Sequence, residues 1–286
     1  MTRSATLLRW TRWLPWLLVG TLCACASPSG VNPTRALALS RERDAVQAFE
    51  RGDLVAARRS YLHALAVHDA LGDLQARSSV VLSLARIAAQ AGRSDEAWAL
   101  LDQVLADGAM LPVQTRISAH GSAGALALAR PDPALAEQHL KRADDMCASA
   151  CADSGALVVL RARLALLQQQ ALQAIALADA ALALPGLQVT RAATGQPAAE
   201  RANALRVRGL AELSLGRAAE AVVSGNAALE IDQALGLVQR VGADLQLLAQ
   251  AHERLGNVEQ ARRHRRLADR AHQAREVLQG QGAAAP

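Results

Sequence analysis

The sequence predicts an all-α fold, a solenoid of about six stacked antiparallel helix hairpins. Ala is the commonest residue, at 65 of 286 positions, and Ala, Leu, Arg, Gln and Glu are all good helix formers. Two distant segments almost match: ALAVHDALGDLQ at 64–75 and ALEIDQALGLVQ at 228–239, an offset of 164 residues. That offset is about four times 41, and it indicates a repeated unit of about forty residues with copies in between.

Each unit contains a Gly-x-x-x-x-Ala motif. Four copies keep the glycine, at Gly52, Gly92, Gly216 and Gly256, and two weaker copies have Pro131 and Gln169 in its place. The motif alanines are separated by 40, 39, 38, 47 and 40 residues; they are Ala57, Ala97, Ala136, Ala174, Ala221 and Ala261. Glycine adopts the left-handed conformation that ends a helix, so we expect each motif to lie at the turn of a hairpin.

Small residues lie at fixed distances from these turns. Seven residues before each turn position are Ala45, Ala85, Gly124, Ala162, Gly209 and Ala249, and seven after each motif alanine are Ala64, Val104, Ala143, Ala181, Ala228 and Ala268. Small side chains on facing sides let the two helices of a hairpin approach closely, and the apolar period continues on both sides of the turn. One hairpin cannot bury its apolar face alone, so successive copies are expected to stack.

This pattern resembles the tetratricopeptide repeat, a family of paired antiparallel helices. The matching positions are Leu84, Ala85, Gly92, Glu96 and Ala97 in the second copy, Leu205, Gly209, Gly216, Glu220 and Ala221 in the fifth, and Leu248, Ala249, Gly256 and Ala261 in the sixth. The resemblance implies a right-handed superhelix. The period near 40 is longer than the family's 34, and the closing proline is missing, as in longer-helix variants of the family.

The repeats set the expected domain boundaries. The repeat domain is expected over residues 38–278, with a loop insertion at about 185–199 inside the 47-residue interval. Before it we expect a signal peptide at 1–24 and a flexible tether at 25–37, which is rich in Ser, Gly, Pro and Asn. Residues 279–286 are expected to form a disordered tail.

The N-terminus has the three parts of a secretory signal. Arg3, Arg9 and Arg12 precede an apolar run at 13–22, and small residues follow. A run of about ten residues is half the length that a membrane-spanning helix needs. A cleaved signal is therefore favoured over a permanent transmembrane anchor.

The tetrapeptide LCAC at 22–25 resembles the bacterial lipobox, Leu-x-Ala/Gly-Cys, with Cys25 as the lipidated residue. Cys23 would then be removed with the signal. The alternative is an ordinary secretory cut after Ala24 or Ala26. The residue after Cys25 is Ala and not the Asp that often retains lipoproteins in the inner membrane, so the resemblance implies anchoring in the outer membrane of a Gram-negative bacterium, facing the periplasm.

Composition argues against several classes of function. Removing the three signal arginines leaves 28 basic and 26 acidic residues, a net charge of +2, whereas nucleic-acid-binding proteins carry a strong basic excess. Only Phe49, Tyr61 and Trp98 remain as aromatic residues. No phosphate-binding glycine loop, zinc-protease helix or serine nucleophile motif occurs. We expect no enzyme activity, no cofactor and no metal site.

Cys147 and Cys151 form the segment MCASAC near the end of the third hairpin. Two thiols this close in an oxidising compartment should form a disulfide. A structural disulfide is favoured over a redox site, whose usual spacing is two intervening residues instead of three. A zinc site would need two further ligands, and only His139 is near in sequence.

Two surfaces are candidate partner sites. In the tetratricopeptide family the first helix of each pair lines an inner groove, and carrying the register over selects Arg86, Arg163, Asn203, Arg206, Gln246, Gln250 and Glu253. Family members use such Asn and Arg residues to hold a peptide carboxylate or backbone. The second surface is a basic stripe at Arg262, Arg266 and Arg270 in the last helix, either a solvated face or a contact for an acidic partner or anionic lipid.

These features predict an outer-membrane-anchored periplasmic scaffold that binds a protein or peptide partner in an envelope complex. Pilus or secretin assembly, or the regulation of cell-wall enzymes, would suit such a module. The alternative is a helical-repeat lipoprotein that binds a small ligand beside a transporter. The low aromatic content disfavours that alternative, because ligand pockets usually have aromatic walls.

Overall fold

The computed structural model describes residues 32–147, 151, 154–188 and 196–283, except the side chains of 154 and 275–283. These residues contain twelve α-helices and two short 3-10 helices and no strand. The α-helices are α1 (Pro33–Glu50), α2 (Leu54–Leu71), α3 (Leu74–Gln90), α4 (Ser94–Asp107), α5 (Val113–Ala129), α6 (Pro133–Met146), α7 (Ser154–Leu167), α8 (Ala171–Ala183), α9 (Gln196–Ser214), α10 (Ala218–Ala234), α11 (Val238–Arg254) and α12 (Val258–Ala283). The 3-10 helices are η1 (Gly108–Met110) and η2 (Pro185–Leu187). The all-α prediction is confirmed.

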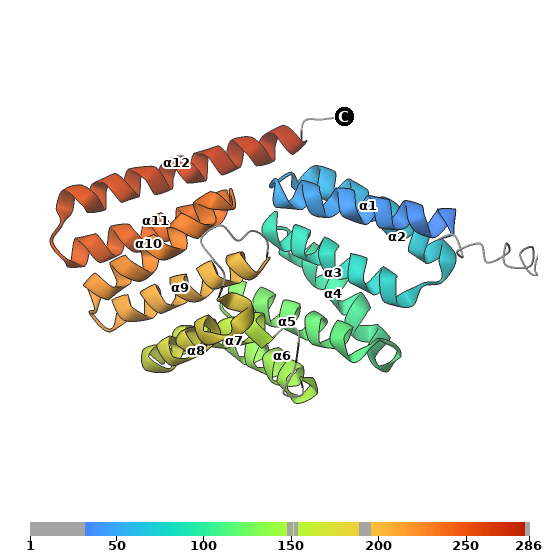
Figure 1. Cartoon of the computed structure of the whole chain (residues 1–286), viewed down its shortest axis with the longest axis horizontal. Helices are drawn as coiled ribbons and strands as arrows, with labels where there is room; N and C mark the ends of the chain where they lie inside the picture. The colour runs from blue at the N-terminus through green and yellow to red at the C-terminus, as the bar shows by residue number, and fades with distance from the viewer. Residues whose placement is uncertain (1–31, 148–150, 152–153, 189–195, 284–286) are drawn as a thin grey trace, which may run out of the picture.

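The helices form six hairpins that stack as an all-α solenoid. Each odd-numbered helix packs against the even-numbered helix that follows it, and each even-numbered helix also contacts the next hairpin. Figure 1 shows the stack as a curved array with α1 and α12 at its two ends. From α3 to α11, successive odd-numbered helices also contact one another. Helices on the inside of a curve lie closest together, so the odd-numbered helices form the inner layer.

The six predicted turn positions all end the first helix of a hairpin with a positive φ. The values are 78° at Gly52, 77° at Gly92, 23° at Pro131, 62° at Gln169, 76° at Gly216 and 74° at Gly256. The turns at Pro131 and Gln169 therefore correspond to the glycine turns although their residues differ. The predicted register holds through all six hairpins, including the two weaker copies.

The small residues of the repeat face one another in the helix interfaces, as expected. All six motif alanines are buried, as are the small residues seven positions before the turns and seven positions after the motif alanines. At Gly209, an added Cβ would lie 2.8 Å from Cδ2 of Leu247, and at Gly124 it would lie 2.9 Å from Cδ2 of Leu140. Even alanine is thus too large at these two positions unless the neighbouring leucine moves.

Three predicted boundaries change in the structure. The first helix begins at Pro33, so the last five residues assigned to the tether are helical. Proline suits the first helical position, and the Asn32 side chain accepts a hydrogen bond from the Thr34 amide at 2.9 Å. Helix α12 continues to Ala283, past the expected boundary at 278. Helix α9 begins at Gln196, which shortens the expected loop insertion.

The predicted signal peptide and the proposed lipidated residue Cys25 lie outside the described residues. No helix within the described part of the chain is both long enough and apolar enough to cross a membrane.

Candidate functional site

The seven predicted groove residues all lie on odd-numbered helices of the inner layer, but their exposure differs. Arg86 on α3 is exposed, and so are Gln246, Gln250 and Glu253 on α11. Arg163 on α7, and Asn203 and Arg206 on α9, are partly buried. The last three therefore belong to a more enclosed part of the inner surface, over the fourth to sixth hairpins.

Arg206 lies between two carboxylates. Its Nε lies 2.6 Å from Oδ1 of Asp244 on α11, and its Nη2 donates to Oδ2 of Asp232 on α10. Its Nη1 donates to Oδ1 of Asn203 at 2.8 Å. The side chains of Asp232 and Asp244 are completely buried, whereas that of Arg206 is 13% exposed. Arg206 thus joins three helices, and the prediction that its guanidinium is free for a partner is wrong.

Burial changes the ionisation of both aspartates. It raises the pKa of Asp232 to about 7, with the adjacent Asp244 carboxylate adding to the rise and Arg206 opposing it. The pKa of Asp244 is also raised, mainly by burial, and the hydrogen bond from Arg206 opposes that rise. The two carboxyl groups share one guanidinium, so a proton on Asp232 relieves the repulsion between them.

Two further arginines lie beside this ion-pair network. Arg240 at the start of α11 donates from Nη1 to the Ala199 carbonyl oxygen at 3.2 Å. Burial lowers its pKa, while Asp232 and Glu200 act in the opposite direction. Together with Arg163 and Arg206 it forms what we call the inner basic cluster.

Arg163 differs from the other two arginines of the cluster. Its side chain forms no hydrogen bond or ion pair with any residue that the structure describes. Burial lowers its pKa, the positive charges of Arg206 and Arg240 add to this effect, and Glu200 opposes it. A partly buried guanidinium between like charges favours the approach of an anion.

Asp232, Asp244, Arg240 and Glu200 are not among the residues that the repeat register selects. Asp232 lies 26 residues after Arg206 and Asp244 lies 38 residues after it. The second distance is close to the length of one repeat. Charged residues separated by about one repeat, in helices that are otherwise apolar, were therefore the sequence feature from which this ion pair could have been predicted. Glu42 and His68 repeat the 26-residue spacing in the first hairpin, with His68 Nε2 2.8 Å from Glu42 Oε1.

The remaining candidate groove residues have other contacts. The Arg86 guanidinium carbon lies 5.3 Å from the centre of the Phe49 ring, a cation–π contact. Glu253 accepts a hydrogen bond from Arg265 of α12 at 2.7 Å. Gln246 and Gln250 have exposed side chains on α11, the helix that also carries Arg240 near its start.

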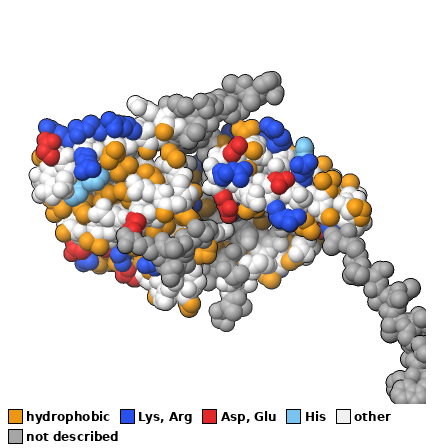
Figure 2. Space-filling view, turned by 45° about the horizontal axis from the view of Figure 1, so that its top comes forward, with side chains coloured by type: hydrophobic (Ala, Val, Ile, Leu, Met, Phe, Trp, Pro, Cys, Tyr) orange, Lys and Arg blue, Asp and Glu red, His pale blue; other side chains and the backbone are white. Residues whose placement is uncertain are grey.

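The predicted basic stripe is exposed on α12. Arg262, Arg266 and Arg270 all lie at the surface, and Arg262 Nη1 donates to Glu259 Oε1 at 3.2 Å. Figure 2 shows a band of basic side chains along one edge of the molecule. The stripe is therefore placed for contact with solvent or a partner, apart from the inner basic cluster.

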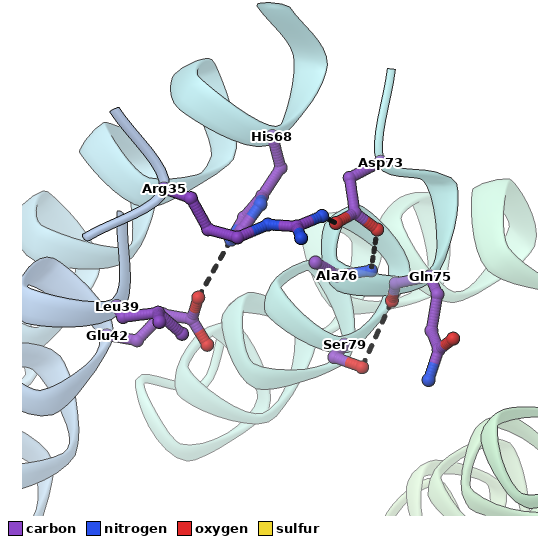
Figure 3. A pocket seen from close by; sticks show the side chains of 8 residues that line it. All are labelled: Arg35, Leu39, Glu42, His68, Asp73, Gln75, Ala76 and Ser79. Atoms are coloured by element: carbon purple, nitrogen blue, oxygen red, sulfur yellow. Dashed lines mark hydrogen bonds and ion pairs between the residues drawn. The ribbon is translucent and has the colours of Figure 1, made fainter. Parts of the chain in front are cut away.

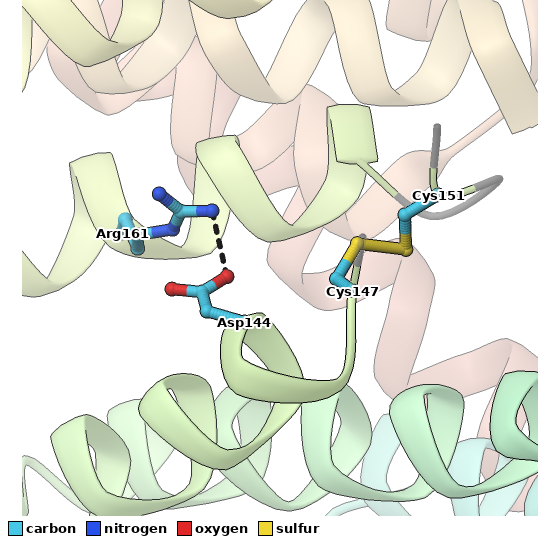
Figure 4. Close-up of a disulfide and its surroundings, with 4 residues drawn as sticks. All are labelled: Asp144, Cys147, Cys151 and Arg161. Carbon is cyan, nitrogen blue, oxygen red and sulfur yellow. Dashed lines mark hydrogen bonds and ion pairs between the residues drawn. A yellow bond between two sulfur atoms is a disulfide. The ribbon is translucent and has the colours of Figure 1, made fainter. Parts of the chain in front are cut away.

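Cys147 and Cys151 form a disulfide, with their Cα atoms 5.3 Å apart. Figure 4 shows it beside the end of α6, near the ion pair between Asp144 and Arg161. In that pair Arg161 Nη2 of α7 lies 2.7 Å from Asp144 Oδ1 of α6. The disulfide and the ion pair lie where the third hairpin meets the fourth, as expected for a structural link. Among the described residues, no group of three or more His, Cys, Asp or Glu side chains is placed to hold a metal ion.

Comparisons with known proteins identify the fold. No protein-family model and no curated protein sequence matches the chain. Among solved structures, it is similar to a Signal Transduction ATPase with Numerous Domains (STAND) protein with a tetratricopeptide repeat sensor from Pyrococcus horikoshii, with a TM-score of 0.56 and 14% identity over 86% of this chain. The chain covers only 35% of that protein. It is also similar to BtubC (BKLC) from P. vanneervenii, with a TM-score of 0.50 and 17% identity over 86% of this chain and 93% of the other. At these identities the likeness shows that the chain has the fold of a tetratricopeptide-like helical repeat.

Proposed function

We propose that this protein is an interaction scaffold and not an enzyme, and that the inner surface of α7, α9 and α11 binds an anionic segment of a protein partner. The observation that supports this proposal most directly is the guanidinium of Arg163, which is partly buried near Arg240 and has no hydrogen-bond or ion-pair partner among the described residues. Arg163 has the charge of Glu200 near it but no hydrogen-bonded carboxylate among the described residues, and a carboxylate of the partner would supply one.

The neighbouring residues suit such a ligand. A buried charge without a partner is unfavourable, so a carboxylate that enters the cluster stabilises both groups. Arg163 can donate two parallel hydrogen bonds to one carboxylate. Gln246 and Gln250 are exposed on α11 and can donate to or accept from the backbone of an extended peptide. Arg206 acts indirectly, because its ion pairs hold α9, α10 and α11 in place.

We further propose that Cys25 carries a lipid and that the scaffold is anchored in the outer membrane, facing the periplasm. The support is the lipobox-like LCAC segment and the Ala that follows it. A scaffold so placed would serve an envelope complex, of the kind that assembles pili or secretins or regulates cell-wall enzymes. The Cys147–Cys151 disulfide is compatible with an oxidising compartment.

Capture in cells tests the binding proposal. The full chain, expressed with its own signal, would be cross-linked in intact cells and purified beside an Arg163→Gln variant and an Arg262→Gln control from the exposed stripe. We expect the wild type and the control to recover the same envelope protein, and Arg163→Gln to recover at least tenfold less. Equal recovery by all three folded proteins would contradict the assignment of the binding site.

Fractionation tests the anchor. Cys25→Ser should leave a soluble periplasmic protein or an unprocessed precursor, whereas Cys23→Ser should leave the protein in the outer-membrane fraction. A Cys25→Ser variant that is processed normally and still floats with outer membranes would contradict lipidation at this residue.

A further inference from the structure

A pocket of about 330 Å³ lies between the first two hairpins, at the opposite end of the solenoid from the inner basic cluster. Figure 3 shows it between α1, α2 and α3. The residues that matter for its chemistry are Arg35, Leu39, Glu42, His68, Asp73 and Ala76. Its volume lies at the lower end of the range for ligand pockets.

The charged groups of the pocket are mostly acidic. Arg35 Nη2 lies 2.7 Å from Asp73 Oδ2, so the Arg35 side chain reaches from α1 to the residue that precedes α3, and it is 56% exposed. His68 Nε2 lies 2.8 Å from Glu42 Oε1. The other oxygen of Glu42 has no hydrogen-bond partner among the described residues. Two carboxylates thus face one exposed guanidinium, and Glu42 keeps an acceptor free.

The same structural unit occurs a second time in the chain. Glycines with positive φ at positions 52, 72 and 92 recur at positions 216, 236 and 256, each 164 residues later. Helices α1, α2 and α3 therefore correspond to α9, α10 and α11. In this register Arg35 corresponds to Ala199, Glu42 to Arg206, His68 to Asp232 and Ala76 to Arg240.

In the second copy, an arginine of the chain itself spans the two helices that correspond to α3 and α1. Arg240 reaches from the first turn of α11 to the Ala199 carbonyl oxygen in the first turn of α9. Its guanidinium interacts with the charges of Asp232 and Glu200. In the first copy the corresponding residue is Ala76, whose methyl group does not fill the space between α1 and α3. Arg35 crosses part of it from α1 to pair with Asp73, and the pocket remains beside it.

We propose that the pocket between the first two hairpins binds an arginine side chain of the partner, in the place that Arg240 fills in the second copy. The inference rests on the proposed scaffold function for the existence of a partner, but the pocket chemistry is a property of this chain alone. The free oxygen of Glu42 accepts a hydrogen bond from the guanidinium. Leu39 and Ala76 contact the methylene groups of the arginine. The partner would then offer an arginine to the first two hairpins and a carboxylate to the last three.

Titration with methylguanidinium tests the pocket without a partner. NMR spectra of the full mature chain, labelled on the alanine methyl groups, should show saturable shifts at Ala76, with a dissociation constant on the order of 1 mM. Methylurea has the same shape and no charge, and it should bind at least tenfold more weakly. Glu42→Gln keeps an oxygen for His68 and should also weaken methylguanidinium binding at least tenfold. Absence of a saturable shift, or equal binding of methylurea, would overturn the inference.

Variants that fill the pocket provide a second test. Ala76→Arg places in the first copy the residue that the second copy has, and it should abolish methylguanidinium binding. Ala76→Leu fills the pocket without charge and should have the same effect if Ala76→Arg does not fold. In reverse, Arg240→Ala should open the second copy, so that methylguanidinium raises its Tm more than that of the wild type. Full binding by a folded Ala76→Arg or Ala76→Leu protein would overturn the inference.

These outcomes separate the two proposals. If methylguanidinium does not bind but Arg163-dependent capture of a partner is observed, only the arginine pocket is wrong. If methylguanidinium binds as described and no partner is ever captured, the pocket stands and the scaffold function is wrong.

Discussion

The Nε of Arg206 lies 2.6 Å from Oδ1 of Asp244, and this ion pair joins α9 to α11 across the boundary between the fifth and sixth hairpins. Replacing Arg206 with Met should lower the free energy of unfolding by about 3–5 kcal/mol, because Asp232 and Asp244 would remain buried without the guanidinium that is hydrogen-bonded to both. Urea unfolding followed by circular dichroism measures the change.

Removing the whole ion-pair network is the matched control. A triple variant, Arg206→Met with Asp232→Leu and Asp244→Leu, should recover most of the lost stability, because apolar residues often replace a buried ion pair without loss. Asn203→Ala leaves both ion pairs of Arg206 in place and should cost less than about 1 kcal/mol. If Arg206→Met unfolds at the same urea concentration as the wild type, the network does not hold the two hairpins together.

The raised pKa of Asp232 makes stability depend on pH. Between its ordinary value of 3.8 and its folded value of about 7, the folded protein holds a proton that the unfolded chain has released. The free energy of unfolding attributable to Asp232 therefore falls as pH rises through this interval, by at most about 1.4 kcal/mol per pH unit. Above pH 7 both states are ionised and the contribution becomes constant.

An Asp232→Asn variant isolates this dependence. Asn keeps an acceptor for Arg206 and does not titrate, so its stability relative to the wild type should rise from pH 4 to pH 7. The comparison is necessary because His120 acts in the opposite direction: burial, with a contribution from His139, lowers its pKa to about 4. A difference between variant and wild type that stays constant over this pH range would contradict the raised pKa of Asp232.

The repeat register was predictable because it depends on backbone conformation and residue size. Both of these constrain which residues can occur at a few fixed positions of a short motif. The glycine turns are an example: Gly52 and Gly216 have φ values of 78° and 76°. The alanines that follow these glycines at fixed spacing are all buried. A regular spacing of small residues was therefore enough to place twelve helices.

The binding surface was less predictable, because the exposure of a long polar side chain depends on helices far away in sequence. Arg206 occupies a groove position in the repeat. Its guanidinium is nevertheless already paired, with Asp244, which lies 38 residues later in the sequence. Arg163 occupies a similar position and has no such partner among the described residues. The sequence selected both arginines, and only the packing of neighbouring hairpins distinguished them.

The Cys147–Cys151 disulfide should stabilise the junction between the third and fourth hairpins. It closes a loop of about five residues, for which the chain-entropy model gives about 2 kcal/mol. Reduction, or the double variant Cys147→Ser and Cys151→Ser, should lower the free energy of unfolding by up to this amount. Reducing agent should not change the stability of the double variant. If it does, the loss of stability on reduction does not come from the Cys147–Cys151 disulfide.

Gln169 provides the last test, because it occupies a left-handed turn position that glycine fills in four other hairpins. Its φ is 62°, and the amide of Gln170 bonds to the Ala165 carbonyl oxygen at 2.8 Å. The corresponding bond in the fifth hairpin, from Arg217 to Glu212, is 2.9 Å long. The two turns thus have the same geometry, but only Gly216 adopts the left-handed conformation without steric cost.

Gln169→Gly should therefore raise the free energy of unfolding by about 0.5–1 kcal/mol, since the left-handed conformation costs a non-glycine residue about 1 kcal/mol. The reverse change, Gly216→Ala, is the matched control: no heavy atom lies within 4 Å of the added Cβ, so its expected loss of about 1 kcal/mol is purely conformational. Paired urea unfolding curves measure both. A Gln169→Gly protein that is less stable than the wild type, beside a destabilised Gly216→Ala protein, would mean that the Gln169 side chain makes contacts that outweigh the backbone term.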